Sequence, residues 1–324
     1  MDIYVKKAII HQFSPDDTDL YLADKFLNIT PKIEEYLRKK IERVYSDEAR
    51  TGIFEEDNPF LEMISDDLLE TSVVVANRWK EEFVVSENQK TNDLVFVEFS
   101  KEGVDHFAFL RIALRETLTH LGGEVDNPIK LTQNNLPGFG TGADEALVIN
   151  LQSRKYHLIE KRIKYNGTFL NYFSENLLQA QPKISPKKSI KALEKTAQKI
   201  AESFNTDDFQ FQSKVKSAIF NHIEEENKLS PEKLADDLFD DNLTARLSFI
   251  DQVKEAVPEP VTFEEIDASR QLKKFENQKL SLSNGIELIV PNNVYEDAES
   301  VEFILNDNGT YSILIKNIED IQSK

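Results

Sequence analysis

The side chains of this chain that could do chemistry are mostly lysines and arginines, and they gather in one stretch, residues 154–199. This stretch holds eleven basic residues against three carboxylates. Residues 1–153 carry 16 basic and 29 acidic side chains, and residues 200–324 carry 12 and 26. Like charge segregated in this way indicates a surface that binds a polyanion such as DNA. The alternative is a solvated face that is rich in lysine.

Ten of these side chains are expected to contact phosphates of double-stranded DNA, by charge neutralisation and without base readout. They are Arg154, Lys155, Lys161, Arg162, Lys164, Lys187, Lys188, Lys191, Lys195 and Lys199. If about five contacts form at once, the affinity should fall with salt at a log–log slope of roughly −4 to −5. The whole chain carries −19, so we expect a modest affinity. Screening over about 8 Å at physiological salt still lets a local cationic band act at contact.

The second half of the basic stretch has the pattern of a two-faced helix over residues 186–204. Ser185 and Pro186 predict its start, because serine caps free amides and proline fits the first helical position. Apolar residues then recur at steps of three or four: Ile190, Leu193, Ala197, Ile200 and Phe204. Lysines at the same spacing occupy the opposite face: Lys188, Lys191, Lys195 and Lys199. We expect an ammonium row about 16 Å long, a spacing that suits phosphates along a duplex.

Tyrosines are interleaved with the first basic residues, a composition used for stacking on single-stranded bases. Tyr156 and Tyr165 are candidates for such stacking. Tyr172 is better explained as part of a helix core, with Phe169 and Phe173 in a helix over residues 169–178.

The elements that position the first basic group form a predicted α+β domain, residues 1–180, in which an antiparallel sheet is combined with helices. Alternating or β-branched runs predict strands at residues 3–13, 20–23, 94–99, 106–115, 146–152 and 156–163. Helical patterns cover residues 30–47, 59–83 and 169–178. A long loop is expected between residues 115 and 146.

A polar segment with two prolines, residues 179–186, predicts the boundary to a second domain, residues 181–324. This domain is expected to be mainly helical, with helices at residues 186–204, 208–226, 231–239, 243–256 and about 263–275. A small three-stranded β meander follows, with strands around residues 286–290, 301–305 and 311–315. Asp307, Asn308 and Gly309 favour a hairpin turn within it, because Asn and Gly tolerate positive φ.

Metal, cofactor and catalytic sites are not expected. The chain has no cysteine, which excludes disulfides and thiolate ligands. The histidines are scattered, at positions 11, 106, 120, 157 and 222. Asp93, Glu98 and Lys101 lack the spacing of a metal nuclease, since an i to i+3 pair faces opposite sides of a strand. The glycine-rich segment 138–142 lacks the Gly-Lys-Ser/Thr ending of a phosphate loop, so we expect a flexible loop in which Phe139 is exposed to a partner.

The beginning of the chain does not have the pattern of a signal peptide. No window approaches about 18 consecutive apolar residues, so no membrane span is expected. We therefore expect a cytoplasmic protein that does not bind a membrane.

The order of short segments along the chain resembles the bacterial 37-kDa nucleoid-associated protein family. The matching segments are Ile9–Gln12, Ile41–Phe54, Phe107–Leu110, Ala146–Leu151, Tyr156–Arg162, Gln271–Leu272, Gly285–Ile286 and Tyr311–Ile313. The resemblance implies a cytoplasmic, non-enzymatic protein that associates with the nucleoid and binds DNA without known sequence preference. Lys161 and Arg162 lie where this family tends to be basic.

A second hypothesis is an acidic interaction adaptor, which basic DNA-processing proteins recruit to the nucleoid. The acidic excess on both sides of the basic stretch favours it. Unlike a direct DNA binder, an adaptor of this kind does not bind naked DNA at physiological salt. A homo-oligomer is compatible with either hypothesis.

Overall fold

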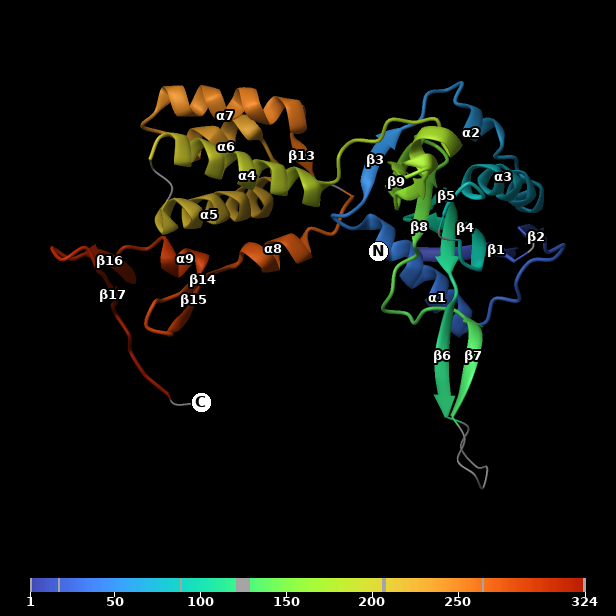
Figure 1. Ribbon diagram of the computed structural model, residues 1–324, viewed down its shortest axis with the longest axis horizontal. Helices are drawn as coiled ribbons and strands as arrows, with labels where there is room; N and C mark the ends of the chain where they lie inside the picture. Colours follow the sequence, from blue (N-terminus) through green and yellow to red (C-terminus); the bar gives the residue numbers. More distant parts are fainter. Residues whose placement is uncertain are drawn as a thin grey trace. The chain divides into compact units, whose positions relative to one another are not determined.

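The computed structural model describes residues 2–16, 18–87, 89–120, 129–205, 208–263 and 265–322. The chain divides into two compact units, residues 1–185 and residues 186–324, both drawn in Figure 1. A large antiparallel sheet with helices occupies the first unit, and helices with small hairpins occupy the second. The predicted α+β class is thus confirmed.

The first unit is built on a seven-stranded antiparallel sheet of order β2-β1-β4-β5-β8-β9-β3. Its strands are β1 (Ile3–Ser14), β2 (Asp19–Tyr21), β3 (Arg50–Ile53), β4 (Asn92–Lys101), β5 (Val104–Ala113), β8 (Glu145–Asn150) and β9 (Lys155–Ile159). The segment between β1 and β2 includes Asp17, which lies outside the described residues.

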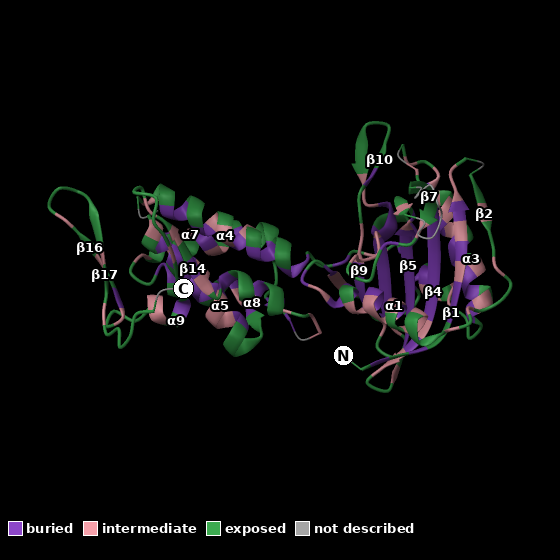
Figure 2. Ribbon diagram, turned by 90° about the horizontal axis from the view of Figure 1, so that it is seen from below, coloured by how far each residue is buried: buried purple, intermediate pink, exposed green. Residues whose placement is uncertain are grey.

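Helices cover both faces of this sheet, so its central strands are buried on both sides (Figure 2). On one face Leu94 and Phe96 of β4 belong to a core with α2 (Pro59–Glu62) and α3 (Leu68–Phe83). On the other, Val95 and Val97 pack in a core with α1 (Pro31–Glu42) and the 3-10 turn Arg43–Tyr45. The middle of strand β4, residues 94–97, is therefore apolar at every position, as strands between two layers are.

Two parts of the first unit differ from the sequence-based prediction. Part of the loop expected after residue 115 forms a hairpin of β6 (Arg115–His120) and β7 (Ile129–Asn135); residues 121–128 are outside the described part of the chain. The strand expected over residues 156–163 ends at Ile159, and a second hairpin follows, β10 (Ile163–Tyr165) with β11 (Thr168–Leu170).

The helix predicted over residues 169–178 is also wrong in its first part. Asn166 and Gly167 have positive φ, 48° and 78°, and an Asn-Gly pair in this conformation makes a tight hairpin turn. Phe169 is therefore in a strand, and only Phe173–Leu177 is helical, as a short π-helix. The turn chemistry of two residues thus overrides the apolar pattern that suggested a helix.

The second unit contains the helices predicted for it. They are α4 (Pro186–Ser203), α5 (Phe209–Glu226), α6 (Pro231–Leu238), α7 (Leu243–Ala256) and the shorter α8 (Ser269–Phe275). Figure 1 shows α4 to α7 gathered around one core, which contains Leu193, Ile219 and Phe249. The Ser230 side chain accepts a hydrogen bond from the Lys233 amide at the start of α6. A two-stranded ladder of β12 (Lys228–Leu229) and β13 (Val261–Thr262) ties the connections together.

The three-stranded meander predicted at the end of the chain is wrong. The structure has two separate hairpins, β14 (Asn277–Ser281) with β15 (Glu287–Pro291) and β16 (Val301–Leu305) with β17 (Tyr311–Ile315). After Pro291 the chain enters the helical turn α9 (Asn292–Tyr295), so β15 cannot run on toward β16. Its partner is instead β14, a polar strand without a clear alternating pattern. The predicted turn at Asp307–Gly309 connects β16 and β17.

Candidate nucleic-acid interface

Helix α4 has one buried and one cationic face. Its buried positions are Pro186, Ser189, Ile190, Leu193, Ala197, Ile200 and Ala201. All five predicted lysines of this helix, Lys187, Lys188, Lys191, Lys195 and Lys199, are exposed. The helical period thus separates an apolar stripe, which packs in the core, from a row of ammonium groups on the surface.

The central lysines of α4 are not engaged by other side chains. Lys188, Lys191 and Lys195 form no hydrogen bond or ion pair with any residue that the structure describes. Lys199 donates to Gln252 Oε1 of α7 at 3.1 Å. Glu194 lies on the same helix, but Lys274 Nζ pairs with its Oε2 at 3.2 Å. The positive charge of this face is therefore largely uncompensated.

The basic residues of the first unit differ from the α4 lysines because three of them form ion pairs. Carboxylates from other segments pair with Arg154, Lys161 and Lys164. Lys161 Nζ lies 2.6 Å from Asp144 Oδ1, and Lys164 Nζ lies 3.0 Å from Glu87 Oε2. Ion pairs with an exposed lysine are weak, so a phosphate can exchange for the carboxylate.

The remaining basic residues of the first unit lie on or beside β9 and β10. Arg154 Nη1 lies 3.7 Å from Glu56 Oε2, and the Arg162 Nε–H donates to Asn171 Oδ1 at 3.3 Å. Lys155 is exposed at the start of β9. The sequence did not indicate these pairings, since the carboxylates come from distant parts of the chain.

The two carboxylates beside Lys161 and Lys164 stay ionised. The Gly167 amide and then Lys164 hold the pKa of Glu87 below its ordinary value. Burial alone would raise the pKa of Asp144, but hydrogen bonds from Lys161 and the Ala113 amide lower it overall. Both lysines are therefore held in place by full negative charges.

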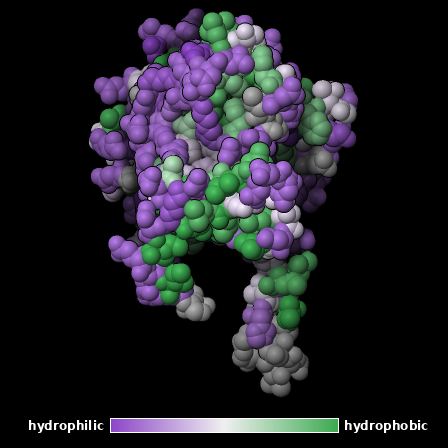
Figure 3. All heavy atoms as spheres, turned by 90° about the vertical axis from the view of Figure 1, so that its left-hand side faces the viewer, coloured by the Kyte–Doolittle hydropathy of each residue, from purple (hydrophilic) through white to green (hydrophobic). Residues whose placement is uncertain are grey.

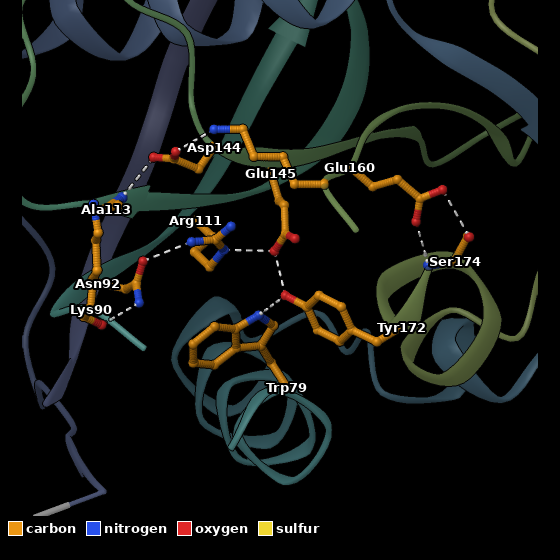
Figure 4. A network of polar contacts seen from close by, with 11 residues as sticks. Trp79, Lys90, Asn92, Arg111, Ala113, Asp144, Glu145, Glu160, Tyr172 and Ser174 are labelled. Atoms are coloured by element: carbon orange, nitrogen blue, oxygen red, sulfur yellow. Dashed lines mark hydrogen bonds and ion pairs between the residues drawn. The ribbon is translucent and has the colours of Figure 1, made fainter. Parts of the chain in front are cut away.

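A buried polar network surrounds Arg111 (Figure 4). Arg111 Nε donates to Glu145 Oε2 at 2.6 Å, and its Nη1 donates to Asn92 Oδ1 at 2.9 Å. The Tyr172 hydroxyl donates to Glu145 Oε2, and Trp79 Nε1 donates to the Tyr172 oxygen at 2.9 Å. Burial alone would lower the pKa of Arg111, but the Glu145 carboxylate raises it above its ordinary value. The guanidinium is thus charged and rigidly placed.

A cavity of about 300 Å³ opens beside this network. Its walls include the predicted Lys161, Arg162 and Lys164, together with Lys90 and Arg111, which sequence reasoning missed. A signal for Arg111 was present, because it is a charge between two apolar strand residues, Leu110 and Ile112, and so indicates a buried ion pair. Lys90 precedes β4 in a polar loop and carried no such signal.

The two tyrosine candidates have different outcomes. Tyr156 is 2% exposed and packs against Phe54 with ring centroids 4.3 Å apart. Its prediction as a stacking residue is therefore wrong, because its position on β9 directs the ring into the core. Tyr165 on β10 is 40% exposed, and the neighbouring Phe169 on β11 is 62% exposed.

The glycine-rich segment 138–142 is a loop, as predicted, and a lysine of α1 anchors it. Lys40 Nζ donates to the carbonyl oxygens of Gly138 at 3.0 Å and Thr141 at 2.5 Å. Burial lowers the pKa of Lys40 to about 8. Phe139 in this loop is 43% exposed.

The C-terminal hairpins present a surface of another kind. A cavity of about 900 Å³ lies between α5 and these hairpins, with apolar and polar walls. Exposed apolar residues there include Ile286, Ile289, Leu305, Tyr311 and Ile315. Figure 3 faces this end of the second unit and shows hydrophobic side chains gathered below a mostly hydrophilic region. Two lysines, Lys216 and Lys279, also line this cavity.

Among the described residues, no helix is both long enough and apolar enough to cross a bilayer. The same residues include no group of three or more His, Asp or Glu arranged to hold a metal ion.

Comparison with known proteins gives one match that covers nearly the whole chain. Residues 9–321 match a family model whose description is nucleoid-associated protein YejK. No individually curated protein matches the chain.

Proposed function

We propose that this chain, which belongs to the family of nucleoid-associated protein YejK, binds the backbone of duplex DNA through the lysine face of α4. The binding is non-specific and involves no catalysis. Membership of this family supports a role at the nucleoid, and the charges on the surface support direct contact with phosphates.

The observation that carries this proposal is the unpaired lysine row. Lys188, Lys191 and Lys195 are exposed on one helix face and have no partner in the described part of the chain. A phosphate can bind them without first displacing a carboxylate. The lysine row at positions 188 to 199 spans about 16 Å along the helix. This length suits contact with successive phosphates along a duplex.

The basic residues of the first unit are proposed as a secondary contact. Arg154, Lys161 and Lys164 must each exchange a carboxylate for a phosphate. Loss of the ion pair offsets part of the binding free energy that each phosphate contact contributes. We therefore expect their removal to weaken binding less than removal of the α4 row.

The test is binding of the full chain to a fluorescent duplex at low salt, with two triple charge reversals compared. The first variant is Lys188→Glu, Lys191→Glu and Lys195→Glu. The control is Lys228→Glu, Lys254→Glu and Lys273→Glu, exposed lysines of the same unit that lie off α4. Both change the net charge equally, so a difference between them reports position and not total charge.

We expect the α4 variant to lose most of its affinity and the control to keep it within a few-fold. Equal loss in both variants would mean that only net charge matters, and unchanged binding in the α4 variant would exclude this face. Absence of duplex binding by the unmodified chain at any salt would leave nucleoid association to basic protein partners.

A further inference from the structure

We propose that the cavity between β5 and β10 is a binding site for a nucleotide, with the phosphate among its cations and the base on Phe169. The ligand class is a 5′-phosphomonoester, either a free nucleotide or the terminal nucleotide of a strand. The strand-end source rests on the proposed DNA binding, whereas the free nucleotide does not.

Five cationic side chains from three segments surround this cavity of about 300 Å³. They are Lys90, Arg111, Lys161, Arg162 and Lys164. The same wall contains one carboxylate, Asp144. In a chain of net charge −19 such a concentration of cations favours a multiply charged anion. The volume lies at the lower end of the range for small-molecule sites.

Arg111 gives the cavity a hydrogen-bond donor that is fixed in place by other side chains. The residue is 7% exposed, and Glu145 and Asn92 occupy two of its three nitrogens. The third nitrogen forms no hydrogen bond with any described residue, and Figure 4 shows it without a dashed contact. This nitrogen is not one of the described buried atoms that lack a partner, so a ligand oxygen or a water in the cavity can accept from it. Planar guanidinium groups are also the preferred donors to phosphate.

Two further cations at the cavity are free to turn toward a ligand. Lys90 Nζ makes no hydrogen bond or ion pair within the described part of the chain. Arg162 uses only its Nε, in a 3.3 Å hydrogen bond to Asn171. Lys161 and Lys164 are held at the rim by their carboxylates. The cavity thus combines one fixed donor, two positioned cations and two mobile ones.

The cavity also has an aromatic wall, which indicates a ligand larger than inorganic phosphate. Phe83 and Phe169 both line it. Phe83 is buried, whereas Phe169 is 62% exposed on the β10–β11 hairpin. An exposed ring beside cations is the arrangement that stacks a nucleobase while its phosphate is neutralised.

A terminal phosphate suits this cavity better than a phosphodiester within a strand. A phosphomonoester carries about −1.5 to −2 charges and three acceptor oxygens. Cations converge on the cavity from β5, from the segment before β4 and from the segment around β10. A diester has chain on both sides and offers only two free oxygens. It would leave part of this donor set unused.

The experiment is calorimetric titration of the full chain with thymidine 5′-monophosphate, thymidine, inorganic phosphate, and a short single strand with or without a 5′-phosphate. The chain has a single tryptophan, Trp79, which stacks on Phe83 at 4.5 Å. Its fluorescence gives a second signal from the cavity. The test variants are Lys90→Gln with Arg162→Gln, and Phe169→Ala, all at exposed positions. The control is Lys188→Gln, Lys191→Gln and Lys195→Gln on α4.

We expect a phosphate-bearing probe to bind more tightly than its unphosphorylated form. In the Lys90/Arg162 variant the affinity for the phosphate-bearing probe should fall by at least about tenfold. Phe169→Ala should lower the affinity for the nucleotide but not the affinity for inorganic phosphate. The α4 control should leave binding of the mononucleotide unchanged. Preference for the mononucleotide would identify a free nucleotide as the source, and preference for the phosphorylated strand would identify a strand end.

Three results would overturn the proposal: no binding of any phosphate-bearing probe, equal binding of thymidine and its monophosphate, or no effect of the Lys90/Arg162 variant. None of these results tests the proposal for α4, which depends on duplex binding. Conversely, loss of duplex binding in the α4 variant with intact nucleotide binding would confirm two separate sites.

Discussion

At the scale of single residues, His11 shows how a histidine that resembles a candidate ligand is used for structure. The Ala23 amide donates to its Nδ1 at 3.0 Å, so the proton of the neutral ring is on Nε2. That nitrogen lies 2.9 Å from Ser72 Oγ. Burial lowers the pKa of His11 to about 4. Both ring nitrogens are occupied, and the residue joins β1 to α3.

This histidine makes the stability of the first unit depend on pH. Because its pKa is lower in the folded state than in the unfolded state, the unfolded chain binds more protons between pH 4 and about 6.5. Stability attributable to His11 is thus present above about pH 6.5 and is lost as the pH falls toward 4.

We expect the unmodified chain to lose more unfolding free energy between pH 7 and pH 5 than His11→Gln does. Urea denaturation at the two pH values measures the difference. An equal loss in both proteins would show that other groups carry the acid sensitivity.

At the scale of elements, Gly52 has a role that its sequence context did not reveal. It lies in β3, an edge strand of the sheet, opposite Tyr156 of β9. A Cβ atom placed on Gly52 would overlap the Tyr156 ring. The missing side chain thus lets the ring cover the strand and reach Phe54.

We predict that Gly52→Ala destabilises the first unit by about 1–3 kcal/mol, because the ring must move within a packed core. Urea denaturation of the variant measures this cost. The control is Gly103→Ser, at a turn with nothing within 4 Å of the added atom. Its φ of 81° adds backbone strain but no clash. A smaller cost at Gly52 than at Gly103 would contradict the steric explanation.

The elements with a long, regular period could be predicted from the sequence, and short elements set by local turns could not. Helix α4 follows from apolar residues repeated over five turns, with lysines on the other face. The β10–β11 hairpin has three residues in each strand, too few for a periodic pattern. Strand β14 likewise has little alternation, so the pairing of β15 was assigned to the wrong neighbour.

The candidate sites show the same limit. The exposure of the α4 lysines follows from their spacing within one helix. The pairing of Lys161 with Asp144 and of Lys164 with Glu87 depends on which strands and loops become neighbours. A single sequence contains no direct record of such contacts. The cavity around Arg111 was missed for this reason, although each of its cations was visible as a basic residue.

At the scale of the whole molecule, an acidic chain presents a local cationic surface. The repulsion between DNA and a net charge of −19 is largely screened beyond the Debye length, about 8 Å at physiological salt. Within that distance the unpaired lysines of α4 dominate the electrostatic interaction with the DNA phosphates. Association should therefore be slow at low salt for a DNA-binding protein, and affinity should come from a few contacts at short range.

The most direct test of this account is the salt dependence of duplex binding, measured for the unmodified chain and for Lys188→Gln, Lys191→Gln and Lys195→Gln. We predict a log–log slope of roughly −4 to −5 for the unmodified chain. Removal of three phosphate contacts should make that slope shallower by about 2.7. The same slope in both proteins would contradict the assignment of phosphate binding to α4.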